Sequence, residues 1–268
     1  MANLEFIKTH NQVAYLEKTE DGDGPKFYEI VDFLNASHIR YALTVSPTLI
    51  VSHITQFWQT AIVKISEEED IEIHSKVDGI SFVVTESTLR RHLKLQDSDG
   101  INNMLNTEIW QEIARMGYDT SNQKLTFQKG CFSPQWRFLI HTLLHSLSPK
   151  RTSWEKFSSN IAIALICLST NRVFNFSKFI FESMVANVNS KTKFLMYPRF
   201  IQTFLNKKKN LLKKHKETFP TPSLQPKVFQ NMAMASRLFN GVEIPLFPEM
   251  LQVVQGEEVG RSTKEEQS

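Results

Sequence analysis

Two histidines four residues apart are the side chains best placed to hold a metal ion. His141 and His145 lie in an apolar stretch that opens at Pro134 and has a helical pattern. At this spacing both imidazoles lie on one face of a helix, as two zinc ligands require. A third ligand has to come from elsewhere, and no motif indicates one. The pair is therefore compatible with a metal-dependent hydrolase site or with two histidines on the flank of a packed helix.

A second candidate for metal chemistry is the acidic stretch Asp97-Ser98-Asp99-Gly100. It begins like a calcium-binding EF-hand loop, and Glu108 stands at the twelfth position. The ligand at position 5 is missing, however, and the glycine falls at position 4 instead of 6. We expect an acidic turn between helices and no cation.

The common catalytic and cofactor motifs are absent from the sequence. It has no G-x-x-x-x-G-K-[ST] or G-x-G-x-x-G loop, no G-x-S-x-G elbow and no H-E-x-x-H. Cys131 and Cys167 stand 36 positions apart, with no C-x-x-C pair, which excludes a zinc knuckle. We expect no enzymatic activity, no cofactor and no small-molecule substrate, and two reduced thiols in an intracellular compartment, cytoplasmic or nuclear.

A dense group of lysines is the candidate binding surface. Its six members within ten residues are Lys207, Lys208, Lys209, Lys213, Lys214 and Lys216. The chain carries a net charge of +3, so the remainder is mildly acidic and the basic character is local. Lysines attract phosphate whatever the base sequence, and the preceding segment holds Tyr197, Phe200 and Phe204. This pattern indicates nucleic-acid binding or a nuclear-import signal. A solvated helix end, which lysines also favour, is the alternative.

The elements that position these residues are mostly helices. Apolar residues recur at helical spacing, and Pro, Thr, Asn and Ser stand at the expected starts. We predict helices within residues 27–34, 47–58, 85–95, 106–117, 134–147, 152–168, 177–188, 198–205 and 226–239. The helix that follows a Thr152–Glu155 capping box is apolar on all sides, from Trp154 to Leu168. We expect it to form the centre of the core.

Strand periodicity is confined to residues 62–84. Apolar and polar residues alternate there, with an acidic loop at 67–70 and an Asp78-Gly79 turn. The fold class predicted is mainly α: a multi-helix globular domain with a small antiparallel hairpin or three-stranded sheet. Residues 1–25 are expected to form a flexible arm, 26–248 a single domain and 249–268 a disordered tail.

Composition agrees with a folded chain that does not cross a membrane. The 268 residues include 20 phenylalanines, and 41% are hydrophobic, which is enough for a sizeable core. The longest purely apolar run, Ile161 to Leu168, is far shorter than the roughly 20 residues of a membrane span. The N-terminus shows no secretory signal.

Several motifs can be considered together. The most specific are 132–138 (FSPQWRF), 171–178 (NRVFNFSK) and 193–200 (KFLMYPRF), and the others are 28–35, 41–44, 56–58, 87–93, 124–129 and 244–248. Together they resemble a domain of unknown function that accompanies the polyproteins of plant long-terminal-repeat retrotransposons of the copia type. The resemblance extends to about residue 255. It implies a mobile-element product and attaches no activity to it.

The preferred hypothesis is therefore a non-enzymatic retrotransposon-derived protein that binds nucleic acid or another retroelement protein. Domains of this kind are often labelled synaptobrevin or longin-like, which implies a membrane-trafficking interaction protein as the first alternative. A longin domain has a five-stranded sheet, whereas the strand pattern here is limited to 62–84. The metal-dependent hydrolase using His141 and His145 is the second alternative.

Overall fold

Helices far outnumber strands in the described chain, as predicted. The computed structural model describes residues 4–121, 124–150, 155–236 and 241–255. Its helices include η1 (Gly24–Phe27), α1 (Tyr28–Ala36), α2 (Arg40–Thr44), α3 (Val51–Thr60), α4 (Glu86–Leu93), α5 (Asn106–Arg115), η2 (Lys129–Cys131), α6 (Pro134–Ser146), α7 (Ser159–Ser169), α8 (Phe176–Asn189), α9 (Pro198–Leu205), η3 (Asn206–Leu211) and α10 (Lys227–Ser236). The mainly α class is confirmed.

The sheet near residues 62–84 is three-stranded and antiparallel. Its strands β1 (Ile62–Ile65), β2 (Ile71–Val77) and β3 (Ile80–Val84) lie in the order β1-β2-β3. The tight turn between β2 and β3 has φ of 51° at Asp78 and 83° at Gly79, the conformation that an Asp-Gly hairpin turn favours. One face of the sheet packs on α3, so the turn holds Asp78 beside that helix.

A second, two-stranded sheet was not predicted. β4 (Thr126–Gln128) pairs antiparallel with β5 (Lys156–Ser158), placing Phe127 opposite Phe157. The central helix α7 therefore begins only at Ser159. The predicted helix 152–168 is wrong for residues 156–158, which form strand β5. Pairing with a distant strand overrides the local helical pattern there. Thr152 and Trp154 lie outside the described residues.

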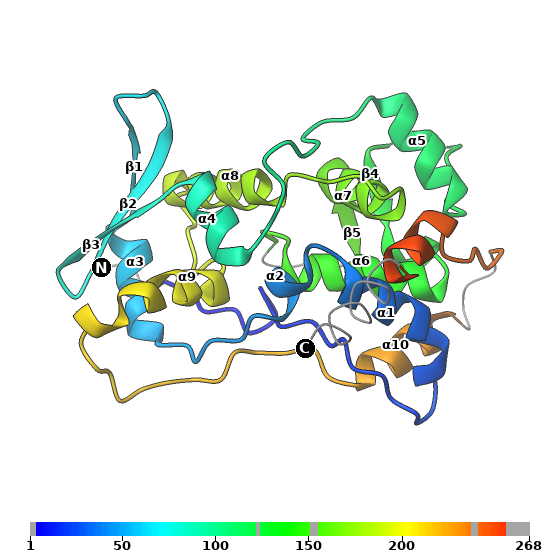
Figure 1. Ribbon diagram of the computed structural model, residues 1–268, viewed down its shortest axis with the longest axis horizontal. Coiled ribbons are helices and arrows are strands. Elements are labelled where there is room, and N and C mark those ends of the chain that lie inside the picture. The colour runs from blue at the N-terminus through cyan, green and yellow to red at the C-terminus, as the bar shows by residue number, and fades with distance from the viewer. Residues whose placement is uncertain (1–3, 122–123, 151–154, 237–240, 256–268) are drawn as a thin grey trace, which may run out of the picture.

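Helix α7 forms the centre of the core. Every residue from Ile161 to Ser169 is buried, in agreement with the prediction from its all-round apolar pattern. α7 packs against α5 and α6, and Figure 1 shows it enclosed among these helices. The interior around 161–169 is thus filled by apolar side chains.

The N-terminal segment differs from the flexible arm that was expected. His10, Asn11, Ala14 and Leu16 are buried. The Val13 N–H donates to the Pro222 carbonyl at 2.9 Å, and the Ala14 N–H to the Leu43 carbonyl at 3.0 Å. Its backbone bonds to carbonyls of α2, of α6 and of the loop at Pro222, so local periodicity does not reveal that it is ordered.

The first part of the expected C-terminal tail, residues 249–255, also differs from that expectation. Residues 248–255 are helical, and Met250 is fully buried. A proline at 248 suits the first turn of a helix, and burial of Met250 fixes that turn on the body. The remaining residues of the expected tail, 256–268, lie outside the described residues.

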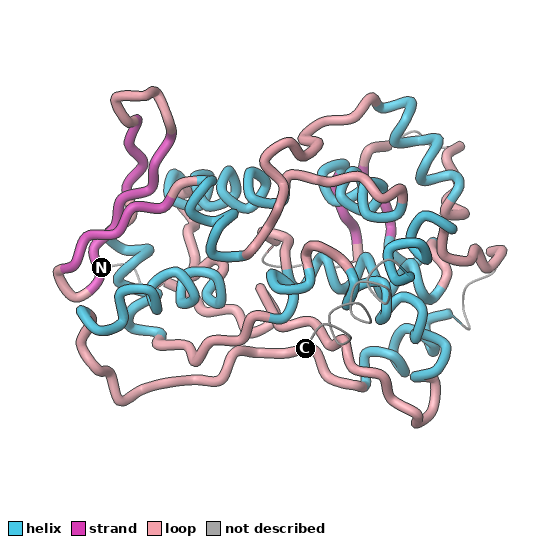
Figure 2. Tube along the Cα trace, in the orientation of Figure 1, coloured by secondary structure: helices cyan, strands magenta, loops and turns pink. Residues whose placement is uncertain are grey.

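The molecule is elongated, with two groups of elements side by side (Figure 1). The three-stranded sheet lies with α3, α4, α8 and α9 in one half, and α1, α5, α6, α7 and α10 lie in the other. Residues 212–226 run as a long extended segment along one edge and connect the halves (Figure 2). Buried side chains from both halves form one continuous cluster. Among the described residues, no helix has the length and apolar character needed to cross a membrane.

Candidate functional site

The lysine cluster lies on the surface at the end of α9. All six lysines are exposed, and in the described part of the chain none of them forms an ion pair. α9 ends at Leu205, η3 follows with a non-helical Lys208, and the backbone is extended at Leu212. The cluster is therefore not a plain helix end, because the chain turns within it and spreads the lysines over two surfaces.

The first of these surfaces is a pocket of about 790 Å³. Its basic members are Lys209, Lys213, Lys214, His53 and His215, and its other lining includes Thr48, Ile50, Gln202, Asn206, Asn210 and Leu212. None of the described residues that line it is acidic. A concave site with one sign of charge concentrates anions.

Behind this pocket, two histidines meet one carboxylate. His53 lies on α3, Asp78 in the β2–β3 turn and His215 on the extended segment after η3. His53 Nε2 is 3.1 Å from Asp78 Oδ2, and His215 Nε2 is 3.3 Å from the same oxygen. The two imidazole rings contact edge to face, with centroids 4.6 Å apart. Within the described residues this is the one group of three or more potential metal ligands that converge.

Hydrogen bonds fix the carboxylate of Asp78 in place. Gln56 Nε2 donates to Oδ1 at 3.1 Å, and the Lys213 N–H donates to Oδ2 at 3.0 Å. Burial raises the pKa of Asp78, but these bonds together with His215 outweigh burial and lower the pKa below its usual value. Asp78 is thus held as an anion beneath the lysines.

His53 is held in its neutral form, in contrast to the charged Asp78. Burial lowers the pKa of His53, and the Asp78 charge opposes this effect only in part. The imidazole is therefore neutral at physiological pH. Its Nδ1 atom is buried and has no hydrogen-bond partner among the described residues.

The second surface faces α4. Lys208 Nζ lies 5.3 Å from the ring centroid of Phe82, whose ring is buried beneath it. Burial lowers the pKa of His92 on α4, and the charges of Arg91 and Lys207 act in the same direction. Arg91 and Lys207 therefore both lie close to His92, and positive charge continues from η3 onto α4.

The aromatic side chains that precede the lysines in sequence are not part of this surface. Tyr197 and Phe200 are at most 1% exposed, and Phe204 is 9% exposed. They pack inside the half that contains α9, so they cannot stack on nucleic-acid bases.

The pair His141 and His145 lies elsewhere, on α6. Their rings are in contact at 4.1 Å between centroids. Burial lowers the pKa of His141 to about 2 and that of His145 to about 4. Lys129 Nζ donates to His141 Nδ1 at 3.1 Å, which places a cationic side chain where a metal would bind. No convergent ligand group of the described chain includes this pair.

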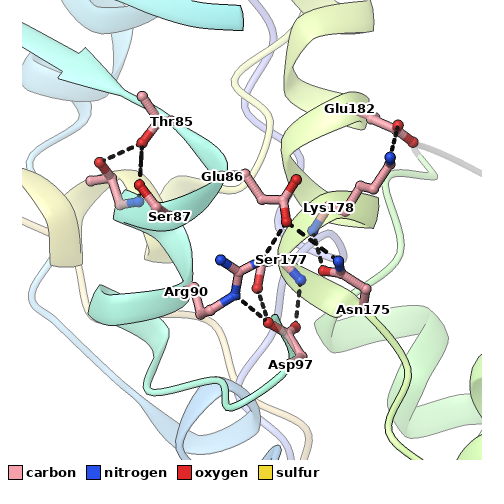
Figure 3. Close-up of polar contacts among 10 residues, drawn as sticks. Thr85, Glu86, Ser87, Arg90, Asp97, Asn175, Ser177, Lys178 and Glu182 are labelled. Carbon is pink, nitrogen blue, oxygen red and sulfur yellow. Dashed lines mark hydrogen bonds and ion pairs between the residues drawn. The ribbon is translucent and has the colours of Figure 1, made fainter. Parts of the chain in front are cut away.

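The acidic turn at 97–100 is also occupied by protein contacts (Figure 3). The buried Asp97 carboxylate accepts hydrogen bonds from Arg90 Nε at 2.8 Å and from the Ser177 N–H at 2.8 Å, and it also contacts the Ser177 hydroxyl. It thereby joins α4 to the N-terminus of α8, where a negative charge is favourable. The expected structural turn is confirmed.

Sequence reasoning predicted the Asp78-Gly79 turn and singled out the lysines around position 215, but it singled out neither His53 nor His215. The only local signal for His53 was a polar side chain on the apolar face of α3. No family profile, curated protein or solved structure matches this chain.

Proposed function

We propose that the protein binds nucleic acid, without a catalytic step, through the lysine cluster. The observation that supports this proposal most directly is the arrangement of six exposed lysines that have no acidic partner among the described residues. Three of them, Lys209, Lys213 and Lys214, line a pocket that has no acidic side chain among its described lining residues, and the basic surface continues towards Arg91. A surface of this kind neutralises successive phosphates of a nucleic-acid backbone.

The same surface favours contacts with phosphate groups over recognition of individual bases. Base recognition in single strands uses exposed aromatic rings, and Tyr197, Phe200 and Phe204 are buried. Binding is therefore expected to depend steeply on salt and weakly on sequence.

A fluorescence-anisotropy titration of two unrelated 20-base-pair duplexes tests the proposal over a range of salt concentrations. If three to six lysines contact phosphates, log K should fall against log salt with a slope between about −3 and −5, equal for both duplexes. Absence of binding at about 50 mM salt, or a slope near zero, would contradict nucleic-acid binding.

Charge-removing variants locate the surface. Lys209→Gln with Lys213→Gln should reduce the magnitude of the slope by about 2. Lys124→Gln with Lys227→Gln is the matched control: it removes two exposed lysines outside the cluster, the second of them on α10 in the other half of the molecule. Equal loss in both double variants would show that the contact is general surface charge.

The proposal includes an origin in a long-terminal-repeat retroelement, which the motifs at 132–138, 171–178 and 193–200 support. A reverse-transcriptase reading frame immediately upstream in the genome is the expected observation. The described strands form sheets of three and two members, so nothing in this part of the chain favours the longin-type alternative.

A further inference from the structure

Three potential metal ligands from distant parts of the chain meet behind the basic pocket. They are His53 on α3, Asp78 in the hairpin turn and His215 on the segment after η3. We propose that these three side chains bind one zinc ion, or a similar divalent transition metal, with a coordination position left for an anionic oxygen. This proposal does not depend on nucleic-acid binding.

The spacing of the ligand atoms fits a small tetrahedral ion. Asp78 Oδ2 is 3.1 Å from His53 Nε2 and 3.3 Å from His215 Nε2. Zinc bonds of about 2.0–2.1 Å place neighbouring tetrahedral ligands about 3.3 Å apart. All three ligand atoms lie within 4.8 Å of one another, so a small inward movement of the two rings completes the set.

The chemical types of the ligands select the metal. Two imidazoles and one carboxylate suit zinc and its neighbours, whereas calcium and magnesium prefer oxygen ligands alone. Three protein ligands are also the usual number where zinc keeps an open position.

The surroundings of Asp78 resemble the outer shell of such a site. Gln56 and the Lys213 N–H orient the Asp78 carboxylate, as hydrogen bonds orient metal ligands generally.

The open position faces the basic pocket. His53 and His215 line the pocket together with Lys209, Lys213 and Lys214. An oxyanion such as phosphate placed there contacts the metal and the ammonium groups together. The ligand class is therefore a phosphate or a related oxyanion, which one metal and several lysines recognise by charge.

Metal binding is tested on the full chain after treatment with a chelator. Titration calorimetry with zinc should give one site per chain, and cobalt(II) should give the visible absorption of four-coordinate geometry. His215→Gln and Asp78→Asn should each weaken zinc binding by at least about tenfold. Asparagine at 78 tolerates the positive φ of the turn, and His215 is partly exposed, so both variants should fold.

His74→Gln is the matched control, since it removes a histidine of the same hairpin that pairs with Glu72 outside the cluster. This variant should bind zinc as tightly as the natural chain. The proposal is overturned if the natural chain binds no zinc at about 10 µM, a weak affinity for a protein zinc site, or if the two ligand variants keep full affinity. Either result would leave the three side chains as a hydrogen-bonded link between the hairpin and the segment after η3.

Titration with inorganic phosphate tests whether the bound metal keeps an open coordination position. Addition of phosphate should change the cobalt spectrum of the natural chain and have a smaller effect in the Lys209→Gln/Lys213→Gln variant. An unchanged spectrum would refute the open position. Zinc binding by that double variant should stay normal, so failure of nucleic-acid binding and failure of the metal site are separate results.

Discussion

Arg199 shows how single buried polar groups connect this molecule. Its guanidinium is fully buried and donates to the carbonyls of Ala42, Val45, Ser146 and Asn11 at 2.7–3.3 Å. Burial lowers the pKa of Arg199 to about 9, so the group stays charged at neutral pH. Four main-chain acceptors take the place of the acidic partner that a buried charge usually has. One side chain thereby fixes the N-terminal segment, the end of α2 and the end of α6.

His10 is a second buried polar group that connects distant segments, and unlike Arg199 it is neutral. Its ring is held as one tautomer: Nδ1–H donates to the Lys150 carbonyl at 3.1 Å, and Nε2 accepts from the Tyr197 N–H at 2.9 Å. Burial lowers the pKa of His10 to about 3, and the Arg199 charge acts in the same direction. A second proton on the ring would face the Tyr197 N–H and break that bond.

Stability is therefore expected to fall as the pH falls below 6.5. Between pH 6.5 and 3 the unfolded chain protonates this histidine and the folded chain does not, so unfolding takes up a proton. At pH 5 the cost is about 2 kcal/mol for His10 alone. Urea unfolding of the natural chain and of His10→Gln at pH 7 and pH 5 measures this loss of unfolding free energy. The variant, although less stable, should lose about 2 kcal/mol less between the two pH values, and an identical loss would contradict this role of His10.

At the scale of elements, the β2–β3 turn decides where Asp78 stands. Asp78 and Gly79 both have positive φ, and the turn sets the register that places Val77 opposite Ile80. A shift of one residue would turn Ile73 and Phe82 away from the core. The position of the candidate metal ligand is thus a consequence of hairpin geometry.

Gly79→Ala should destabilise the protein by about 1 kcal/mol, because an L-residue is strained at positive φ. Space is not limiting, since nothing lies within 4 Å of the position of an added Cβ. Gly130→Ala is the matched control: it has equal space and no positive φ, and its stability should change by less than about 0.5 kcal/mol. Denaturant unfolding compares the two, and equal effects would show that backbone conformation is not the cause.

At the scale of the whole molecule, two segments without regular structure connect its halves. Residues 4–16 contact α6 and the loop before α9, and residues 212–226 pair with residues 13 and 49. Figure 2 shows how much of one edge consists of such extended chain. Residues 10–16 belong to the core although their secondary structure is that of a loop, whereas most residues of 212–226 are exposed.

The amides of Gln12, Val13 and Ala14 should therefore exchange slowly with deuterium. Their N–H groups donate to the His145, Pro222 and Leu43 carbonyls at 2.9–3.0 Å, so exchange requires these contacts to open. Hydrogen-exchange mass spectrometry of peptides covering residues 10–15 measures it, with the exposed loop 67–70 as a fast-exchanging reference. Exchange as fast as in that loop would show that the segment is an arm after all.

The sequence alone predicted what depends on neighbours along the chain. Helix starts at Pro134 and Pro198 and near Thr85, the Asp78-Gly79 turn and the apolar α7 all follow from spacings within about one turn of a helix or strand. The candidate binding surface was also visible, because the six lysines are local in sequence. Local preferences of residues carry this information without knowledge of the fold.

Only the tertiary structure decided which distant residues meet. His53 and Asp78 are 25 positions apart, and Asp78 and His215 are 137 apart, so no periodicity connects them. The pairing of β4 with β5 and the burial of residues 10–16 depend on distant partners in the same way. His53, Asp78 and His215 meet because α3, the hairpin and the segment after η3 pack against one another. That packing depends on the whole chain and not on local spacing.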